Sequence, residues 1–230
     1  MNRVITFNKM IKIEDHFYIE NKVCGEGTYG VVYKGKLKSL NKKDPNAPTG
    51  EYAIKFFKKS KSNPAENFDY NSIYRELFLQ SGLEHVGVLP ILYYQILPDS
   101  IGNTAIVTPF MNNGSLHSIL EEEGISIKND RWNGTKRAIS IFGISAAMTF
   151  IHQKGIIHRD LKTANVLLDS KMEPKICDFG LSKSFDSEIE NKGCQTMRIG
   201  TLAYMAPELI VGNGNYGFEI DVFAYSMVLY

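Results

Sequence analysis

The run HRDLKTAN at residues 158–165 decides how this chain folds. Four fixed residue types at fixed spacing arise by chance at roughly 1 in 10⁵ positions, taking about one in 20 per residue. A charged surface turn would account for the charges in this run. It would not account for DFG at residues 178–180, which follows at a short distance after KIC at 175–177. The two runs together therefore indicate a site rather than a solvated loop.

Three side chains in these runs carry candidate chemistry. Asp160 can accept or orient the proton of an attacking hydroxyl group. Asn165 offers an amide oxygen to a metal ion, and Asp178 offers a hard, anionic oxygen of the kind that Mg²⁺ prefers. These residue types predict a metal-binding site beside an acidic catalytic group.

Upstream, GEGTYGVV at residues 25–32 contains the pattern G-x-G-x-x-G. Glycines in a tight hairpin let backbone N–H groups approach phosphates without obstruction by side chains. Alone the pattern is weak, since a plain turn or a dinucleotide-binding site uses it too. A dinucleotide site needs a helix directly after the glycines, whereas residues 31–33 continue as a strand. The sequence therefore favours a phosphate-binding hairpin.

Lys55 closes the apolar strand run YAIK at residues 52–55. A buried ammonium group without a partner is costly, and Glu76 on the next predicted helix is the natural counter-ion. The alternative is an edge-strand lysine with its ammonium group in water. The glycine-rich run upstream favours the ion pair.

The order of predicted elements indicates an α+β fold. Before residue 112 we expect a small antiparallel sheet with one helix on it. After residue 114 the chain becomes mainly helical, with Ile141, Ile144, Met148 and Ile151 at helical spacing and Gly155 as a C-cap. The predicted strands are 17–23, 31–37, 51–57, 88–97, 105–110, 155–157 and 166–168, and the predicted helices are 72–81, 132–154 and 221–230.

The composition sets broad limits on the class of protein. The 230 residues are 43% hydrophobic and 22% charged, with a net charge of +1, so nothing indicates nucleic-acid binding. No apolar stretch approaches the ~20 residues that span a membrane. Three scattered cysteines without a C-x-x-C pair indicate a reducing compartment, and we expect a cytoplasmic location.

With these motifs in view, the chain from about Phe17 to its end resembles the eukaryotic protein kinase superfamily. Residues 158–169, 176–182 and 200–208 are most similar to the tyrosine-kinase-like (TKL) group of serine/threonine kinases. The resemblance implies a bilobal fold. It divides the chain into an N-terminal flank at 1–14, a small β-sheet lobe at 15–111 and a larger, mainly helical lobe at 112–230.

The resemblance also implies ATP and Mg²⁺ as ligands and protein serine or threonine side chains as substrates. Lys162 after Asp160, and Thr201 before residues 206–208, are typical of serine/threonine kinases. Asp160 is then the catalytic aspartate, Lys162 contacts the γ-phosphate, and Asn165 and Asp178 bind the metal ions. The nucleotide is held by the glycine lid (Gly25, Glu26, Gly27, Gly30), by Lys55 paired with Glu76, by Val32, Ala53 and Leu167 around the adenine, by Thr108 as gatekeeper and by the backbone of Met111.

Residues 182–201 resemble an activation loop. Phosphorylation there, by an upstream kinase or by autophosphorylation, could order the loop by pairing the phosphate with Arg159. The candidate acceptors are Ser182, Ser184, Ser187, Thr196 and Thr201, of which Thr196 is preferred. The histidines other than His158, among them His152, are interpreted as surface or packing residues.

The chain stops at Tyr230, inside what the resemblance makes the central helix of the large lobe. We therefore expect an incomplete domain that is poorly stable and weakly active when expressed alone. The main alternative to an active enzyme is a pseudokinase or scaffold of the same fold that binds nucleotide without transferring phosphate. The presence of Lys55, Asp160, Asn165 and Asp178 disfavours it.

Overall fold

The computed structural model describes residues 9–27, 30–38, 50–58, 70–96, 104–124, 131–184, 202–211 and 216–230. By its contacts the chain divides into two compact units. The first comprises residues 1–71 and 90–110, and the second comprises residues 72–89 and 111–230. The segment 72–89, which the predicted lobe boundaries place in the first lobe, therefore clusters with the second unit. Each unit has a hydrophobic core of its own.

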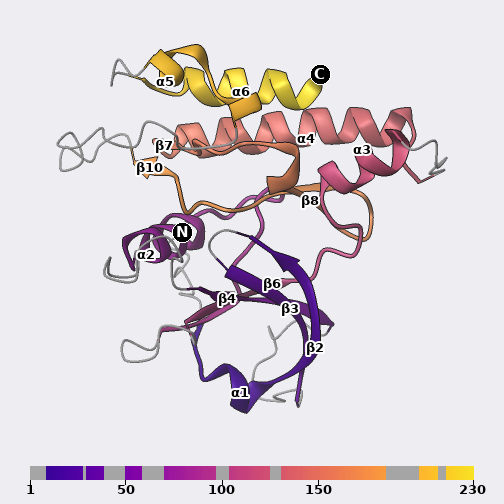
Figure 1. Cartoon of the computed structure of the whole chain (residues 1–230), viewed down its shortest axis with the longest axis vertical. Helices are drawn as coiled ribbons and strands as arrows, with labels where there is room; N and C mark the ends of the chain where they lie inside the picture. The colour runs from indigo at the N-terminus through magenta and orange to yellow at the C-terminus, as the bar shows by residue number, and fades with distance from the viewer. Residues whose placement is uncertain are drawn as a thin grey trace, which may run out of the picture. The chain divides into compact units, whose positions relative to one another are not determined.

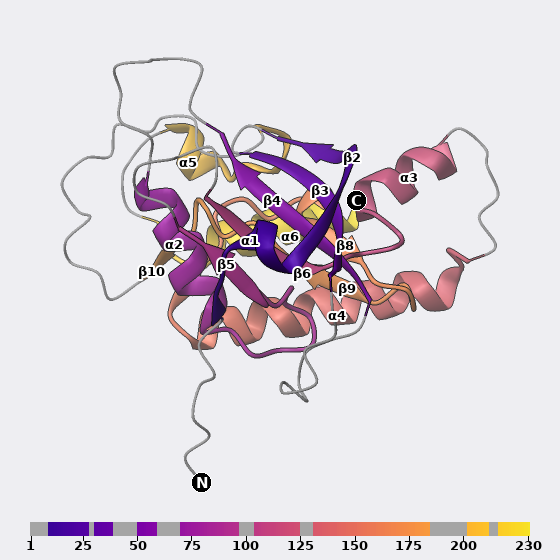
Figure 2. The same cartoon turned by 90° about the horizontal axis from the view of Figure 1, so that it is seen from below.

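The first unit is built on a six-stranded sheet with the strand order β1-β5-β6-β4-β3-β2. Neighbouring strands are antiparallel except β1 and β5, which are parallel. Figure 2 shows β2, β3 and β4 side by side in this sheet. The elements are β1 (Lys9–Met10), α1 (Ile13–His16), β2 (Phe17–Glu26), β3 (Gly30–Leu37), β4 (Glu51–Phe57), β5 (Tyr93–Gln95) and β6 (Ala105–Pro109).

Alternation along the strands separates the two faces of this sheet. Tyr52 and Ile54 on β4, with Ala105 and Val107 on β6, point to one face and form the core of the unit. The ring of Phe17 meets that of Tyr52 edge-on, with 5.1 Å between centroids. The other face of β4 is therefore left to residues at odd positions.

The second unit is mainly helical. Figure 1 shows its longest helix, α4, lying along α6, and the Tyr225 hydroxyl on α6 donates a hydrogen bond of 2.9 Å to the Ile141 carbonyl on α4. The helices are α2 (Tyr70–Ser81), α3 (Leu116–Gly124), α4 (Gly134–Gln153), α5 (Pro207–Val211) and α6 (Glu219–Leu229), with the 3₁₀ turns η2 (Thr163–Asn165) and η4 (Leu202–Tyr204). The short strands are β7 (Ile156–Ile157), β8 (Val166–Leu168), β9 (Pro174–Ile176) and β10 (Lys183–Ser184).

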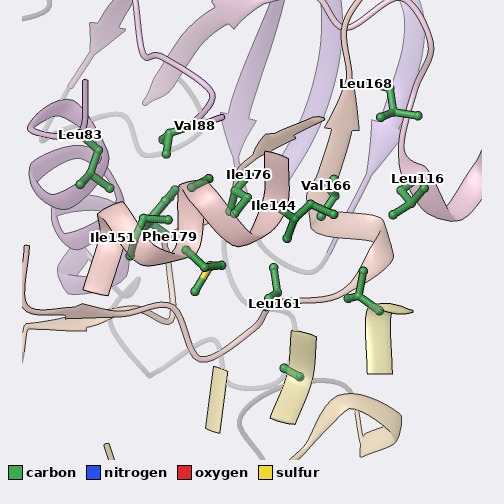
Figure 3. Close-up of a cluster of buried hydrophobic side chains, with 14 of the residues drawn as sticks. Leu83, Val88, Leu116, Ile144, Ile151, Leu161, Val166, Leu168, Ile176 and Phe179 are labelled. Atoms are coloured by element: carbon green, nitrogen blue, oxygen red, sulfur yellow. The ribbon is translucent and has the colours of Figure 1, made fainter. Parts of the chain in front are cut away.

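Helix α4 packs one face on the core of this unit. Ile144 lies near Ile176 and Val166, and Ile151 lies beside Phe179 in this cluster of buried side chains, as Figure 3 shows. Gly143 lies on the same stretch, and a Cβ atom there would come within 2.6 Å of the Pro174 ring, so glycine lets β9 approach the helix. Ile141, three residues before Ile144, is 41% exposed, so helical spacing alone does not show which of these side chains face the core.

The ends of α4 follow the sequence signals. The Asn133 side chain caps the first turn by accepting a hydrogen bond of 3.1 Å from the Lys136 N–H. Gly155 follows the helix with a φ of 69°, the left-handed conformation expected of a C-cap. The N-cap and the C-cap explain why the helix begins at Gly134 and ends at Gln153.

One predicted strand is much shorter in the structure. Within the predicted range 88–97, only Tyr93–Gln95 form a strand, and position 97 lies outside the described residues. Val88 instead makes a single parallel bridge to Ile176. Pro90 has no N–H to donate, so a continuous ladder cannot pass through it. The remaining predicted elements are present, with ends that shift by up to three residues, and the α+β fold class is confirmed.

Among the helices that the structure describes, none is both long enough and apolar enough to cross a membrane.

Candidate functional site

In the first unit, four predicted nucleotide-binding residues share one face of the sheet. Val32 on β3 pairs with Lys55 on β4, and Ala53 on β4 pairs with Thr108 on β6. Residues paired across antiparallel strands lie on the same face, as do residues two apart on one strand. Val32, Ala53, Lys55 and Thr108 therefore lie together on the face opposite the core of this unit.

Lys55 is half-buried on this face. Its ammonium nitrogen lies 5.1 Å from the centroid of the Phe57 ring, within the range of a cation–π interaction. Glu76 belongs to the second unit, where it is buried on α2. The predicted ion pair between the two residues stays a prediction.

The glycine-rich turn between β2 and β3 is closed by a hydrogen bond of 3.0 Å from the Gly27 N–H to the Gly30 carbonyl. A Cβ atom at Gly30 would lie 2.5 Å from the Phe56 carbonyl oxygen, so only glycine fits there. A Cβ atom at Gly27 would have no heavy atom within 4 Å, and one at Gly25 would make ordinary contacts with Val32. Open space at Gly27 is what a ligand approaching the backbone requires.

Glu26 lies at the end of β2 and forms an ion pair with Lys58. Its carboxylate is thus turned toward its own sheet. Residues 28 and 29, in the middle of the turn, lie outside the described residues.

In the second unit, the turn at residues 160–165 brings three predicted site residues into direct contact. Asp160 Oδ2 accepts hydrogen bonds of 2.7 Å from Lys162 Nζ and 2.9 Å from Asn165 Nδ2. Asn165 Nδ2 also donates to the Asp160 carbonyl at 2.8 Å. The Asp160 side chain is 8% exposed, and in the part of the chain described here its Oδ1 makes no hydrogen bond. One carboxylate oxygen is held in place by two donors, and the other has no hydrogen bond to the described residues.

His158 is fully buried, and its ring contacts the backbone of this turn. It accepts a hydrogen bond of 3.3 Å at Nδ1 from the Asp160 N–H, and its Nε2 lies 3.1 Å from the Cys177 carbonyl. Both bonds are satisfied by the neutral ring with its proton on Nε2. The ring also meets Phe179 edge-on at 4.9 Å. His158 therefore connects the run at 158–165 to the run at 178–180.

Asp178 follows β9 with a φ of 66°, a conformation that is uncommon for residues other than glycine. A Cβ atom on Gly180 would lie 3.5 Å from Asp178 Oδ1 and 3.7 Å from Glu76 Oε2, so both carboxylates lie close to Gly180. Helix α2 is also connected to this stretch by Arg75, which donates to the Gly180 carbonyl at 3.5 Å. The carboxyl end of β9 and helix α2 are thus held together.

The residues present fit a magnesium ion. Both hydrogen bonds of the Asn165 side chain use its NH₂ group, so its carbonyl oxygen is left for a metal. Mg²⁺ is commonly bound by one or two protein oxygens together with phosphate oxygens and water. Among the described residues, no group of three or more His, Cys, Asp or Glu is arranged around a possible metal. Asn165 and Asp178 would suffice for the kind of site expected here.

Leu167 and Met111 complete the predicted set in this unit. Leu167 on β8 lies between the fully buried Val166 and Leu168 and is itself half-buried, so it faces away from the core. The Met111 carbonyl accepts a hydrogen bond of 3.1 Å from the Gly114 N–H. Among the described residues, the Met111 N–H donates no hydrogen bond, so this N–H is the backbone group that a ligand could contact.

Asp221 is a buried residue beside the candidate site, and the sequence indicated it only as the start of the last helix. Its carboxylate is 1% exposed and accepts hydrogen bonds from the backbone N–H groups of His158 at 2.7 Å and Arg159 at 2.9 Å. Arg159 has a φ of 69°, so this bond holds a strained residue directly before Asp160. The available signal was an acid, Asp221, placed directly before the mostly apolar run of α6.

His152 makes the third bond to this carboxylate, with Nε2 2.9 Å from Asp221 Oδ2. Its ring also packs on Phe218, with 4.7 Å between centroids. From the sequence, His152 was interpreted as a surface or packing residue. The structure gives it a specific hydrogen bond as well, because α4 and α6 lie side by side.

We expect the substitution His152→Phe to lower the stability by about 1–3 kcal/mol, since it leaves one acceptor position of a buried carboxylate unfilled. The thermal midpoint should fall by about 2–4 °C per kcal/mol. Phenylalanine keeps the ring contact with Phe218. His152→Gln, whose amide can still donate to Asp221, should recover at least half of the loss. Equal midpoints for wild type and His152→Phe in thermal denaturation would contradict this role.

Most of the predicted activation loop, residues 185–201, lies outside the described residues, including Ser187, Thr196 and Thr201. Of the acceptors that are described, Ser182 is fully buried and its hydroxyl donates to the His158 carbonyl at 3.1 Å. A kinase cannot reach a hydroxyl in that position, so the structure argues against Ser182 as a phosphorylation site. Ser184 lies half-buried on β10.

Residues 18–230 match the protein kinase domain family, so the chain belongs to that family.

Similar curated proteins carry kinase names. The chain is 33% identical over 218 residues to cysteine-rich receptor-like protein kinase 24 of Arabidopsis thaliana, covering 93% of this chain and 30% of that protein. It is 33% identical over 206 residues to a probable serine/threonine-protein kinase of Dictyostelium discoideum, covering 90% and 20%. It is 33% identical over 218 residues to receptor-like serine/threonine-protein kinase SD1-7 of Arabidopsis thaliana, covering 94% and 23%. The chain thus spans less than a third of the length of each.

Proposed function

We propose that this chain is the catalytic domain of a protein serine/threonine kinase, which transfers the γ-phosphate of ATP to serine or threonine hydroxyls of protein substrates. The observation that carries the proposal is the state of the Asp160 carboxylate. Oδ2 is held by Lys162 and Asn165, while Oδ1 has no partner in the described chain.

In this mechanism Asp160 Oδ1 accepts the hydrogen bond, and then the proton, of the attacking hydroxyl. Because Oδ2 is fixed by two donors, the carboxylate does not have to reorient during the reaction, and this lowers the cost of aligning the nucleophile. The Lys162 ammonium group lies at the same carboxylate and supplies positive charge where the γ-phosphate is expected. Such fixed charges stabilise the transition state without reorganisation.

The residues that would hold the ligands come from the sheet face in the first unit and from the turns and strands of the second unit. Asn165 and Asp178 would hold Mg²⁺, which neutralises charge on the phosphate oxygens. The face bearing Val32, Ala53, Lys55 and Thr108, with the glycine turn, would contact the nucleotide in the first unit. In the second unit, the nucleotide would be contacted by Leu167 and by the Met111 backbone, and Glu76 would pair with Lys55.

Serine and threonine are favoured as acceptors over tyrosine. Lys162 stands two residues after Asp160, as the resemblance to serine/threonine kinases requires. Two of the similar proteins, the Dictyostelium discoideum kinase and SD1-7 of Arabidopsis thaliana, are named as serine/threonine-protein kinases.

Labelled ATP with Mg²⁺ and a generic protein substrate tests the proposal. We expect phosphoserine or phosphothreonine with the wild-type protein and almost none with Lys55→Met or Asp160→Asn. Nucleotide binding without transfer, shown by a thermal shift with ATP and no labelled product, would instead support the pseudokinase alternative. Label on tyrosine alone would contradict the assigned acceptor.

The cytoplasmic location, the TKL assignment, and activation by an upstream kinase or by autophosphorylation stay predictions. Phosphopeptide mapping of active enzyme, searching for phosphate on Thr196, tests the last of them.

A further inference from the structure

Two hydroxyl groups from distant parts of the chain meet beside the catalytic turn. Thr163 Oγ1 lies 2.8 Å from the Tyr204 hydroxyl oxygen, a hydrogen bond in which either group can donate. Thr163 is 5% exposed, and the half-buried Tyr204 packs against the core of the second unit. Among the described residues, neither side chain makes another hydrogen bond.

Thr163 occupies a position from which it can control the catalytic turn. It begins the 3₁₀ turn η2 and lies directly between Lys162 and Asn165, the two residues that hold Asp160 Oδ2. The turn is closed by a hydrogen bond of 2.9 Å from the Asn165 N–H to the Lys162 carbonyl. A short 3₁₀ turn has few internal bonds of its own, so an external bond at Thr163 helps to fix its orientation.

Tyr204 ends the 3₁₀ turn η4, whose first residue, Leu202, is 71% exposed. The Met205 N–H donates to the Leu202 carbonyl at 3.2 Å, and Ala206 is buried, so the end of this segment is anchored. A protein substrate must bring its hydroxyl to Asp160. The exposed start of η4 is connected, through Tyr204 and Thr163, to the turn three residues from Asp160.

We propose that Thr163 and Tyr204 form a positioning pair, which fixes the segment 202–206 to the catalytic turn and so aligns a protein substrate with Asp160. Neither residue is catalytic. The inference rests on the proposed kinase function and adds to it the contact that couples substrate alignment to the catalytic turn. It predicts an effect on transfer to protein and little effect on the use of ATP.

A double-mutant cycle with two shape-conserving substitutions tests the pair. Thr163→Val and Tyr204→Phe each remove one hydroxyl and keep the volume. Each should lower kcat/KM for a peptide substrate by about 3- to 10-fold, the worth of one hydrogen bond, with KM for ATP unchanged within about 2-fold. The double variant should lose no more than either single variant. Thr163→Ser, which keeps the hydroxyl, should stay within about 2-fold of wild type.

Three outcomes would overturn the pair. The first is multiplicative losses in the double variant, the second is a Thr163→Ser variant as impaired as Thr163→Val, and the third is a KM for ATP that rises as much as kcat/KM for the peptide falls. An inactive wild-type protein would contradict the proposed function and this inference with it. An active wild type with multiplicative losses would contradict the inference alone.

Discussion

Replacing Asp160 with asparagine is expected to lower kcat by about 10²- to 10⁴-fold, the usual contribution of a positioned acid or base. The amide oxygen of asparagine can take the place of Oδ2 and accept from Lys162 and Asn165. Its NH₂ group then stands where Oδ1 was and cannot accept a proton. Stability should therefore change little while turnover collapses. Steady-state kinetics with saturating ATP, together with thermal denaturation, measure both.

Asp169→Asn is the matched control for this substitution. Asp169 Oδ1 accepts from the backbone N–H groups of Lys171 and Glu173 at 2.9 Å each, and Lys175 Nζ lies 3.3 Å from Oδ2. Burial raises the pKa of Asp169, but these N–H groups and the Lys175 ammonium outweigh it, so the pKa lies below its ordinary value of 3.8. Its stabilising contribution is present above that pH and is lost as the pH falls through the lowered pKa.

The control should therefore reduce stability near neutral pH and leave kcat within about 2-fold of wild type. A kcat for Asp160→Asn within about 10-fold of wild type would contradict the role given to Asp160. So would a loss in Asp169→Asn as large as the loss in Asp160→Asn.

Replacing Asp221 with alanine should give the largest loss of stability. The substitution leaves the N–H groups of His158 and Arg159 and the His152 ring without their buried acceptor. Each unsatisfied buried group costs about 1–3 kcal/mol. We expect a loss of about 3–5 kcal/mol, or roughly 6–20 °C in the thermal midpoint. Urea and thermal denaturation measure the change.

Activity should fall as well, because Arg159 precedes Asp160 and its strained backbone depends on Asp221 Oδ1. Kinetics recorded at a temperature where the variant is still folded separate this effect from unfolding. Glu219→Ala provides the control on the same helix, since Glu219 is exposed and its Oε1 accepts from the Gly217 N–H at 2.6 Å. Its cost should be within about 0.5 kcal/mol. Equal midpoints for the two variants would contradict the role of Asp221.

Contacts between residues close in sequence were predictable. Asp160, Lys162 and Asn165 lie within six residues, so a local turn is enough to bring their side chains close to one another. The sheet face bearing Ala53 and Lys55 followed from the alternation of a strand. The glycines of the hairpin were predicted to let the backbone approach a phosphate. The structure shows a second reason for glycine at position 30, its close approach to the Phe56 carbonyl, which no sequence pattern reveals.

Contacts between distant residues were not predictable. His152 and Asp221 are 69 positions apart, and Thr163 and Tyr204 are 41 apart. Neither pair has a spacing that a helix or strand would reveal. The same limit applies to Ile141, because its exposure depends on which face of α4 the core of the second unit covers.

The sequence by itself determined the family, the order of the elements and the identity of the chemical groups, since these depend on local spacing and residue type. Only the tertiary structure decided which oxygen of Asp160 is held, which acid anchors the turn behind it, and which hydroxyls meet beside it. A hydrogen bond requires two atoms about 3 Å apart, and for residues far apart in the chain that distance is set by how helices and strands pack.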